Sequence, residues 1–178
     1  MTKHNASEIL GIIFPFLPRH AERLLDGGKD VFAKYLARAN LAGLKVGNRI
    51  LFYVSGGSRQ IVGEARIGQI EFLTPDQLLE KYEDRLFITR EELRQYTTKQ
   101  PGRTSSKPLF VAILNSMKKY AMPVVRQMPI TMAGINLTKD VYRSIIRSNA
   151  LARQPIVRAG NLPNTPGEHF DNTTTKSE

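Results

Sequence analysis

The residues best suited to bind a nucleic acid form a dense basic and aromatic cluster in the second half of the sequence. The cluster consists of Lys118, Lys119, Tyr120 and Arg126. Lysine and arginine neutralise phosphates, and an aromatic ring offers a face on which an unpaired base can stack. Arg143 and Arg147 are spaced one helical turn apart in a predicted helix, and they would extend the cluster if that helix packs nearby. The alternative for all six residues is an ordinary solvated face.

Four further candidates for contacts with bases or phosphates lie nearer the N-terminus: Lys29, Lys34, Tyr35 and Arg59. Lys29 follows a glycine pair, where a freer backbone lets a ligand approach closely. Alternatively, its positive charge interacts favourably with the negative C-terminal end of the preceding helix dipole. Lys34 and Tyr35 place a cation beside a ring, as proteins that bind single-stranded RNA do, although Tyr35 could also pack in the core. Arg59 follows a Gly-Gly turn and is either a phosphate contact or a solvated arginine.

The net charge of +10 in 178 residues is unevenly distributed. Between Arg94 and Arg158 there are twelve lysines or arginines and one acid, whereas Glu71 to Glu92 holds seven acids and three basic residues. This distribution is typical of a protein that binds a phosphate backbone. Solubility or an anionic membrane surface are the alternatives, and the acidic segment could be a docking face.

Several classes of function lack their usual residues in this sequence. There is no cysteine, which favours a reducing compartment and rules out thiolate metal sites. No apolar run approaches the ~18–20 residues of a membrane span, so we expect a soluble cytoplasmic protein that makes no membrane contact. The three histidines are scattered, and no catalytic triad, phosphate-binding glycine loop or dinucleotide fingerprint is present. We therefore expect no metal and no cofactor.

The elements that position the candidates are short and mixed in type. Apolar and alternating runs predict strands at residues 8–16, 30–36, 49–54, 60–67 and 109–114, with 119–123 as a candidate partner of the last. Phe52 and Tyr53 on the strand 49–54 are interpreted as core residues. Amphipathic or capped segments predict helices at residues 18–28, 75–83, 89–96 and 139–149.

These elements indicate an α+β fold, a small mixed β-barrel of about six or seven strands with about four short helices. The hairpin that spans residues 46–72 would form part of the barrel wall. Residues 1–153 are expected to form the domain. Residues 154–178, rich in Pro, Asn, Thr and Gly, are expected to form a flexible, disordered tail.

The order of these motifs resembles the PUA-like superfamily, which includes PUA, ASCH and EVE-type domains. The resemblance rests on PRHAERLLDGGKD, then VGNRILFYVSG followed by RQIVGEARI, and it covers residues 8 to 150. The downstream segments EELRQY, KPLFVAILNSMKKYAMPV and PITMAGINLTKDVYRSI are similar to an uncharacterised archaeal branch of the group. Members mostly bind RNA, often as appendages of RNA-modifying enzymes, or recognise modified bases, so the resemblance implies an RNA-binding protein.

A subset of ASCH-type members hydrolyses modified nucleosides and carries the pattern Gly-x-Lys-x-x-Glu-x-Arg after the first helix. Here the pattern aligns with residues 27–34, where glycine and Lys29 match but Phe32 replaces the glutamate and Lys34 the arginine. Without that carboxylate, no residue of the pattern is an obvious general acid or base for amide hydrolysis. Glu64 or Asp30 could substitute, although the spacing does not favour either.

We therefore predict an RNA-binding domain that recognises a modified base or a structured element of tRNA or rRNA. Its phosphate contacts would come from Arg59, Lys118, Lys119 and Arg126, and its base contacts from Lys29, Lys34 and Tyr35. An RNA-modification enzyme or a ribonucleoprotein is the expected macromolecular partner. The alternatives are a modified-nucleoside amidohydrolase or other nucleic-acid-processing enzyme, and a protein-interaction module within a ribonucleoprotein.

Overall fold

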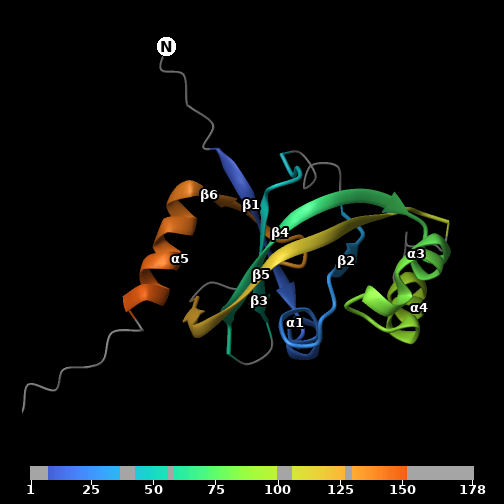
Figure 1. Ribbon diagram of the computed structural model, residues 1–178, viewed down its shortest axis with the longest axis horizontal. Helices are drawn as coiled ribbons and strands as arrows, with labels where there is room; N and C mark the ends of the chain where they lie inside the picture. Colours follow the sequence, from blue (N-terminus) through green and yellow to red (C-terminus); the bar gives the residue numbers. More distant parts are fainter. Residues whose placement is uncertain (1–7, 37–42, 56–57, 100–105, 127–129, 152–178) are drawn as a thin grey trace, which may run out of the picture.

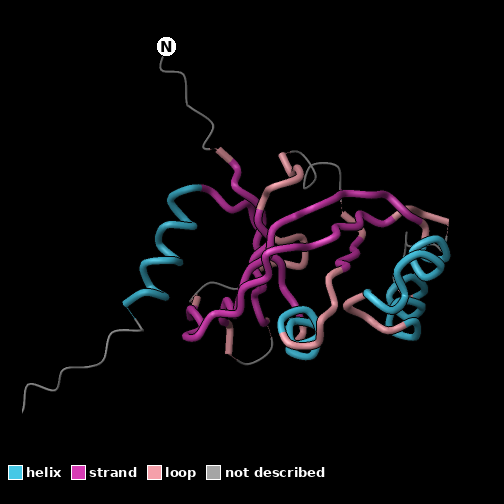
Figure 2. The backbone as a smooth tube through the Cα atoms, viewed as in Figure 1, coloured by secondary structure: helices cyan, strands magenta, loops and turns pink. Residues whose placement is uncertain are grey.

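A computed structural model describes residues 8–36, 43–55, 58–99, 106–126 and 130–151. The described elements comprise six strands, four α-helices and one short 3-10 helix (Figures 1 and 2). The strands are β1 (Ile9–Phe16), β2 (Val31–Lys34), β3 (Arg49–Val54), β4 (Gln60–Leu73), β5 (Leu109–Val125) and β6 (Ile135–Thr138). The helices are α1 (Pro18–Leu25), α3 (Pro75–Tyr82), η1 (Glu83–Arg85), α4 (Arg90–Thr98) and α5 (Lys139–Leu151).

All six strands join one mixed sheet in the order β2-β5-β4-β3-β1-β6. Only β1 and β3 run parallel, because α1 and β2 intervene between them in the chain, and the remaining pairs are antiparallel. The predicted α+β class is confirmed. Among the described residues the edge strands β2 and β6 are not paired with each other, so the sheet is open and the predicted closure into a barrel is not seen.

The apolar run of the central strands is explained by a core on each face of the sheet. Phe14 and Phe52 belong to the larger core, which α1, α3 and α4 help to cover, and both rings are fully buried. Ile13, Leu51 and Tyr53 alternate with them and enter a smaller core against α5. Successive residues of a strand point to opposite faces, so a strand buried on both sides must be apolar throughout. The predicted burial of Phe52 and Tyr53 is confirmed.

The predicted helix boundaries follow from local hydrogen bonds. Thr89 and Glu92 form a capping box at the start of α4, and Thr74 and Gln77 form another at the start of α3. Gly28 has a φ of 67°, and the N–H of the next residue donates to a carbonyl of α1, as in a glycine-terminated helix.

The second half of the sheet departs from prediction in two places. Residues 119–123 do not form a separate partner strand for 109–114, because both segments belong to β5, which continues along β4. The chain bends at Ser116, where φ is 48°, instead of reversing. The short strand β6 was not predicted from the sequence. The glycines of the predicted turn at 56–57 and the predicted tail at 154–178 lie outside the described residues.

Gly11 allows β1 to approach β3 closely. A Cβ at this position would lie 1.9 Å from the carbonyl oxygen of Arg49, whereas a Cβ on Gly28 would meet nothing within 4 Å. Replacing Gly11 with alanine must therefore push two central strands apart. We expect Gly11→Ala to lower the free energy of unfolding by more than ~3 kcal/mol. Gly28→Ala should cost only about 1–2 kcal/mol, through its left-handed backbone alone. Urea unfolding of both variants measures the difference, and equal losses would contradict this account of β1.

Candidate nucleic-acid interface

A cavity of about 360 Å³ opens beside the edge strand β2, between the ends of β1 and β3 and the helices α1 and α4. Much of its wall is aromatic, formed by Phe16, Phe32, Phe87 and Tyr96. Phe32 contacts Phe16 and Phe87 with ring centroids 5.5 and 5.2 Å apart, so three of the rings form one packed group. The cavity thus offers flat apolar surfaces at a size typical of small-molecule sites.

Polar groups from four elements or their flanking residues line the rest of the cavity. Arg19 and His20 come from α1, Lys34 from β2 and Ser55 from the end of β3. Glu92 and Gln95 come from α4, and Lys99 is the C-cap residue of that helix. The lining thus holds three basic side chains, Arg19, Lys34 and Lys99, and one carboxylate, so its net positive charge attracts an anion.

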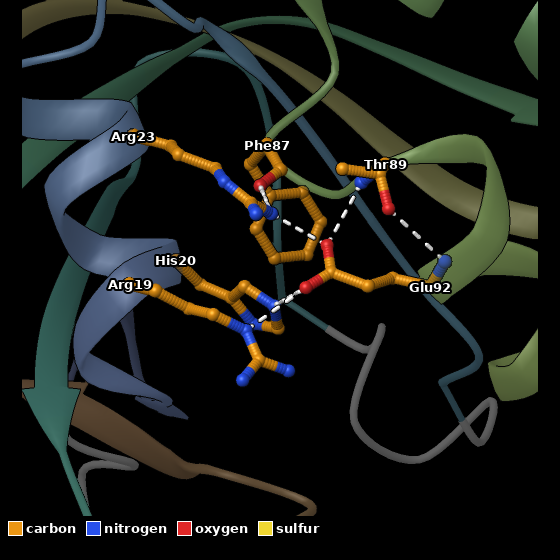
Figure 3. Close-up of polar contacts among 6 residues, drawn as sticks. All are labelled: Arg19, His20, Arg23, Phe87, Thr89 and Glu92. Atoms are coloured by element: carbon orange, nitrogen blue, oxygen red, sulfur yellow. Dashed lines mark hydrogen bonds and ion pairs between the residues drawn. The ribbon is translucent and has the colours of Figure 1, made fainter.

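Glu92 joins α1 to α4 (Figure 3). Its Oε1 accepts a hydrogen bond from Arg19 Nε at 2.9 Å and lies 3.4 Å from His20 Nε2. Its Oε2 accepts from Arg23 Nη1 and, at 2.9 Å, from the Thr89 N–H. One carboxylate thus caps its own helix and holds three residues of another.

These contacts fix the charge of Glu92. Burial acts to raise the pKa of the carboxyl, but the Thr89 N–H, Arg23 and His20 outweigh it and bring the pKa to about 2. The pKa of His20 is lowered, chiefly by burial, with Glu92 partly opposing the shift. A carboxylate with so low a pKa and its lone pairs already engaged is poorly suited to act as a general base near neutral pH.

Among the predicted base contacts, Lys34 lines the cavity, and its Nζ lies 4.8 Å from the centroid of the Phe14 ring. Tyr35 lies behind the wall: its ring stacks on Tyr96 at a centroid distance of 5.5 Å, and its N–H donates to the Tyr96 hydroxyl. Lys29 does not line the cavity. Its Nζ instead donates to the Asp84 carbonyl oxygen.

The predicted phosphate contacts lie mostly along β4 and β5. Arg59 directly precedes β4 and Arg126 directly follows β5. The two residues lie side by side, because the Arg126 N–H donates to the Arg59 carbonyl oxygen at 2.9 Å. Lys118 and Lys119 are exposed further along β5, and Lys119 pairs with Asp26 just after α1, at 2.6 Å. We call these four residues the basic arm.

Two predicted groups are not brought to the cavity. Arg143 and Arg147 are exposed on α5, at the opposite end of the sheet from α4 (Figure 1). Tyr120 is only 3% exposed and packs in the smaller core, so its ring is not available on the surface for stacking. The alternation of strand residues explains this placement, because Tyr120 points to the face opposite its exposed neighbour Lys119.

The ASCH-type hydrolase pattern has no carboxylate at the matching place. Phe32 is 2% exposed within the aromatic group and fills the position of the pattern's glutamate. Asp30 is held by Arg85 through two hydrogen bonds. Glu64 is 4% exposed, pairs with Arg49 and accepts from the Tyr142 hydroxyl near α5. Neither proposed substitute lines the cavity.

Sequence reasoning missed most of the cavity lining. Among the polar residues of the lining, Lys34 is a candidate from the sequence, whereas Arg19, Glu92 and Lys99 are not. The sequence does contain a signal for this site. A carboxylate, an aromatic ring and a lysine (Glu92, Tyr96 and Lys99) follow one another at helical spacing, so they lie close together along the helix. The pairing of that helix with α1 depends on tertiary contacts between residues far apart in the sequence.

Residues 9–139 match the family model described as "Domain of unknown function (DUF365)". The chain belongs to the DUF365 family. It is 33% identical over 105 residues to "Uncharacterized protein MJECS03" of Methanocaldococcus jannaschii, an alignment that covers 56% of this chain and 97% of that protein.

The fold of this DUF365 domain is that of the ASCH domains. The crystal structure of ASCH from Zymomonas mobilis superposes with a TM-score of 0.64 at 14% identity, covering 77% of this chain and 94% of that one. A mutant of the same protein gives a TM-score of 0.65 at 15% identity, with 79% and 97% covered. The resemblance to the PUA-like superfamily, which includes these domains, is therefore confirmed for the fold.

Two further observations concern the described part of the chain. None of its helices is both long and apolar enough to cross a membrane. Within the same residues, no three histidine, aspartate or glutamate side chains gather in a way that could hold a metal ion.

The charge of Glu92 makes the stability of this domain sensitive to acid. Because its pKa is lower in the folded state than the ordinary 4.5, its stabilisation is complete above pH 4.5 and is lost as the pH falls toward 2. The shift corresponds to about 3 kcal/mol. Glu92→Gln keeps a capping-box side chain but removes the charge, so we expect its unfolding free energy to vary less between pH 5 and 2 than that of the wild type. Urea unfolding at several pH values tests this, and parallel pH profiles would contradict it.

Proposed function

We propose that this protein binds single-stranded RNA, with one unpaired base inside the cavity and the adjoining phosphates on its cationic rim. The observation that carries the proposal is the combination of an aromatic wall with Arg19, Lys34 and Lys99 around a cavity of about 360 Å³. Proteins recognise single-stranded RNA by stacking splayed bases on aromatic side chains while cations follow the backbone. The ASCH fold supports the proposal at the level of the superfamily.

The basic arm offers a path for the rest of the strand. Lys119 reaches Asp26 at the C-terminal end of α1, while Arg19 lies at the N-terminal end of the same helix. An eight-residue helix is about 12 Å long, so the arm begins about that distance from the cavity. A short run of nucleotides can span it, with further phosphates on Lys118, Arg126 and Arg59.

Hydrolysis of a nucleoside is less well supported than binding. The carboxylate in the cavity is Glu92, whose low pKa and four hydrogen-bonding neighbours favour a structural role. The docking alternative keeps some support, because only three of the seven acids of residues 71–92 form ion pairs within the described residues. Glu71 pairs with Lys81, Glu83 with Arg90, and Glu92 with Arg19 and Arg23. A modified base, or an element of tRNA or rRNA, remains our prediction for the natural ligand.

A matched pair of charge reversals on α4 and its C-cap tests the site. Lys99 lines the cavity, whereas Arg94 is exposed on the same helix and does not line it. We expect Lys99→Glu to weaken binding of a single-stranded RNA about threefold to tenfold, and Arg94→Glu to weaken it much less. Fluorescence titration of a labelled octanucleotide measures both. Equal losses would mean that the cavity is not the site and that net charge alone drives binding.

The basic arm is tested by the salt dependence of the same titration. Replacing Lys118 and Lys119 together with glutamate removes two potential phosphate contacts. The slope of log affinity against log salt should then fall in magnitude by about 1.4, since each phosphate on a single strand contributes about 0.7. An unchanged slope would place the RNA backbone elsewhere, and matched DNA in the same series shows whether the 2′-hydroxyl contributes.

A further inference from the structure

The cavity touches the edge of β2 and not one of its faces. Its lining includes three consecutive residues of that strand, Phe32, Ala33 and Lys34. Successive side chains of a strand point to opposite faces, so a cavity on one face would touch only alternate residues. Contact with three in a row means that the cavity lies against the side of the strand, where main-chain N–H and C=O groups point.

Three hydrogen bonds of β2 and the residues beside it establish which main-chain groups point toward the cavity. The Asp30 carbonyl oxygen accepts from the Leu114 N–H at 2.7 Å, so it faces β5. The Val31 carbonyl oxygen accepts from the Phe87 N–H at 3.0 Å, and the Tyr35 N–H donates to the Tyr96 hydroxyl at 3.2 Å; both therefore face away from β5.

Because main-chain groups alternate in direction along an antiparallel strand, Ala33 must face the same way as its neighbours at 31 and 35. Its N–H and C=O lie between the contacts made by Phe87 and Tyr96, and both of these residues line the cavity. Within the described residues, no hydrogen bond outside the strand ladder involves either group. Ala33 is nonetheless only 3% exposed.

A buried main-chain donor and acceptor without partners is unusual, because nearly all such groups in proteins are hydrogen-bonded to protein, water or ligand. We infer that the Ala33 main chain reads the Watson–Crick edge of the bound base. Its N–H donates to a ring carbonyl or ring nitrogen, and its C=O accepts from the adjacent ring N–H or amino group. This inference rests on the proposed binding of a base in the cavity and adds the atoms that recognise it.

The edge of β2 fits a compact ring better than an added peptide strand. Strand addition uses several consecutive main-chain groups along an exposed edge. Here the flanking groups at Val31 and Tyr35 are already engaged, which leaves the single donor and acceptor of Ala33. A nucleobase presents such a complementary pair on one rigid edge, and this edge is free only when the base is unpaired.

Methylation of the base at its pairing nitrogen tests the inference without altering the protein. We expect octauridine to bind at least about tenfold more tightly than the same oligomer of 3-methyluridine, because the methyl group removes the N–H and blocks two hydrogen bonds of ordinary strength. Charge and stacking surface are retained in the methylated oligomer. Equal affinities for the two oligomers would overturn the inference.

Ala33→Pro removes the donor from the protein side. Proline lacks an N–H and is tolerated on edge strands where that group points away from the sheet, so no ladder hydrogen bond is lost. We expect weaker binding of octauridine and little change for the methylated oligomer, since both changes remove the same contact. Ala33→Gly keeps the N–H and should retain the preference for octauridine. Circular dichroism checks that both variants are folded. If the proline variant unfolds, the comparison of octauridine with the methylated oligomer on the wild-type protein still tests the inference.

Lys99→Glu separates this inference from the proposed function. If Lys99→Glu weakens the binding of both oligomers and methylation does not change affinity, the proposed base binding is supported. The inference that the Ala33 main chain contacts the base is then overturned. If neither change affects affinity, both are overturned.

Discussion

The ionised carboxylate of Glu92 is the interaction on which the cavity depends. It caps α4, the helix that carries Tyr96 and has Lys99 as its C-cap residue, and it pairs with Arg19 and Arg23 on α1. Without this link, α1 and α4, which both line the cavity, would share few polar contacts. The aromatic packing of Phe87 against Phe16 and Phe32 supplies the apolar counterpart, so the same wall is held by charge and by ring contacts.

The uneven charge of the chain has a structural explanation. Four acids, Glu71, Glu83, Glu92 and Asp30, are used within the fold, where they join neighbouring elements through pairs with lysines and arginines. The excess of basic residues is then left on the surface, along the basic arm and on α5. A protein organised in this way keeps its positive potential facing solvent while its negative charges stabilise its helices.

Local patterns predicted the fold well and the site poorly. The capping boxes at Thr74 and Thr89 and the doubly buried strand β3 were readable because each depends on neighbours in sequence. The continuation of β5 past Ser116 was not, since a residue other than glycine with positive φ gives no sequence signal. The cavity was missed because its lining comes from residues as far apart in the sequence as Pro15 and Met132, which no local pattern connects.

The position of β1 in the sheet has a consequence for synthesis of the chain. Of the six strands, β1 is synthesised first. In the sheet it lies between β3, which pairs with it from Arg49 onward, and β6, which pairs with it as far as Thr138. A nascent chain therefore carries an apolar segment that stays unpaired along one side until nearly the whole domain has left the ribosome. Long-range pairing of this kind slows folding and exposes unpaired edges to aggregation. Production of the protein thus favours slow translation, low temperature or the presence of chaperones.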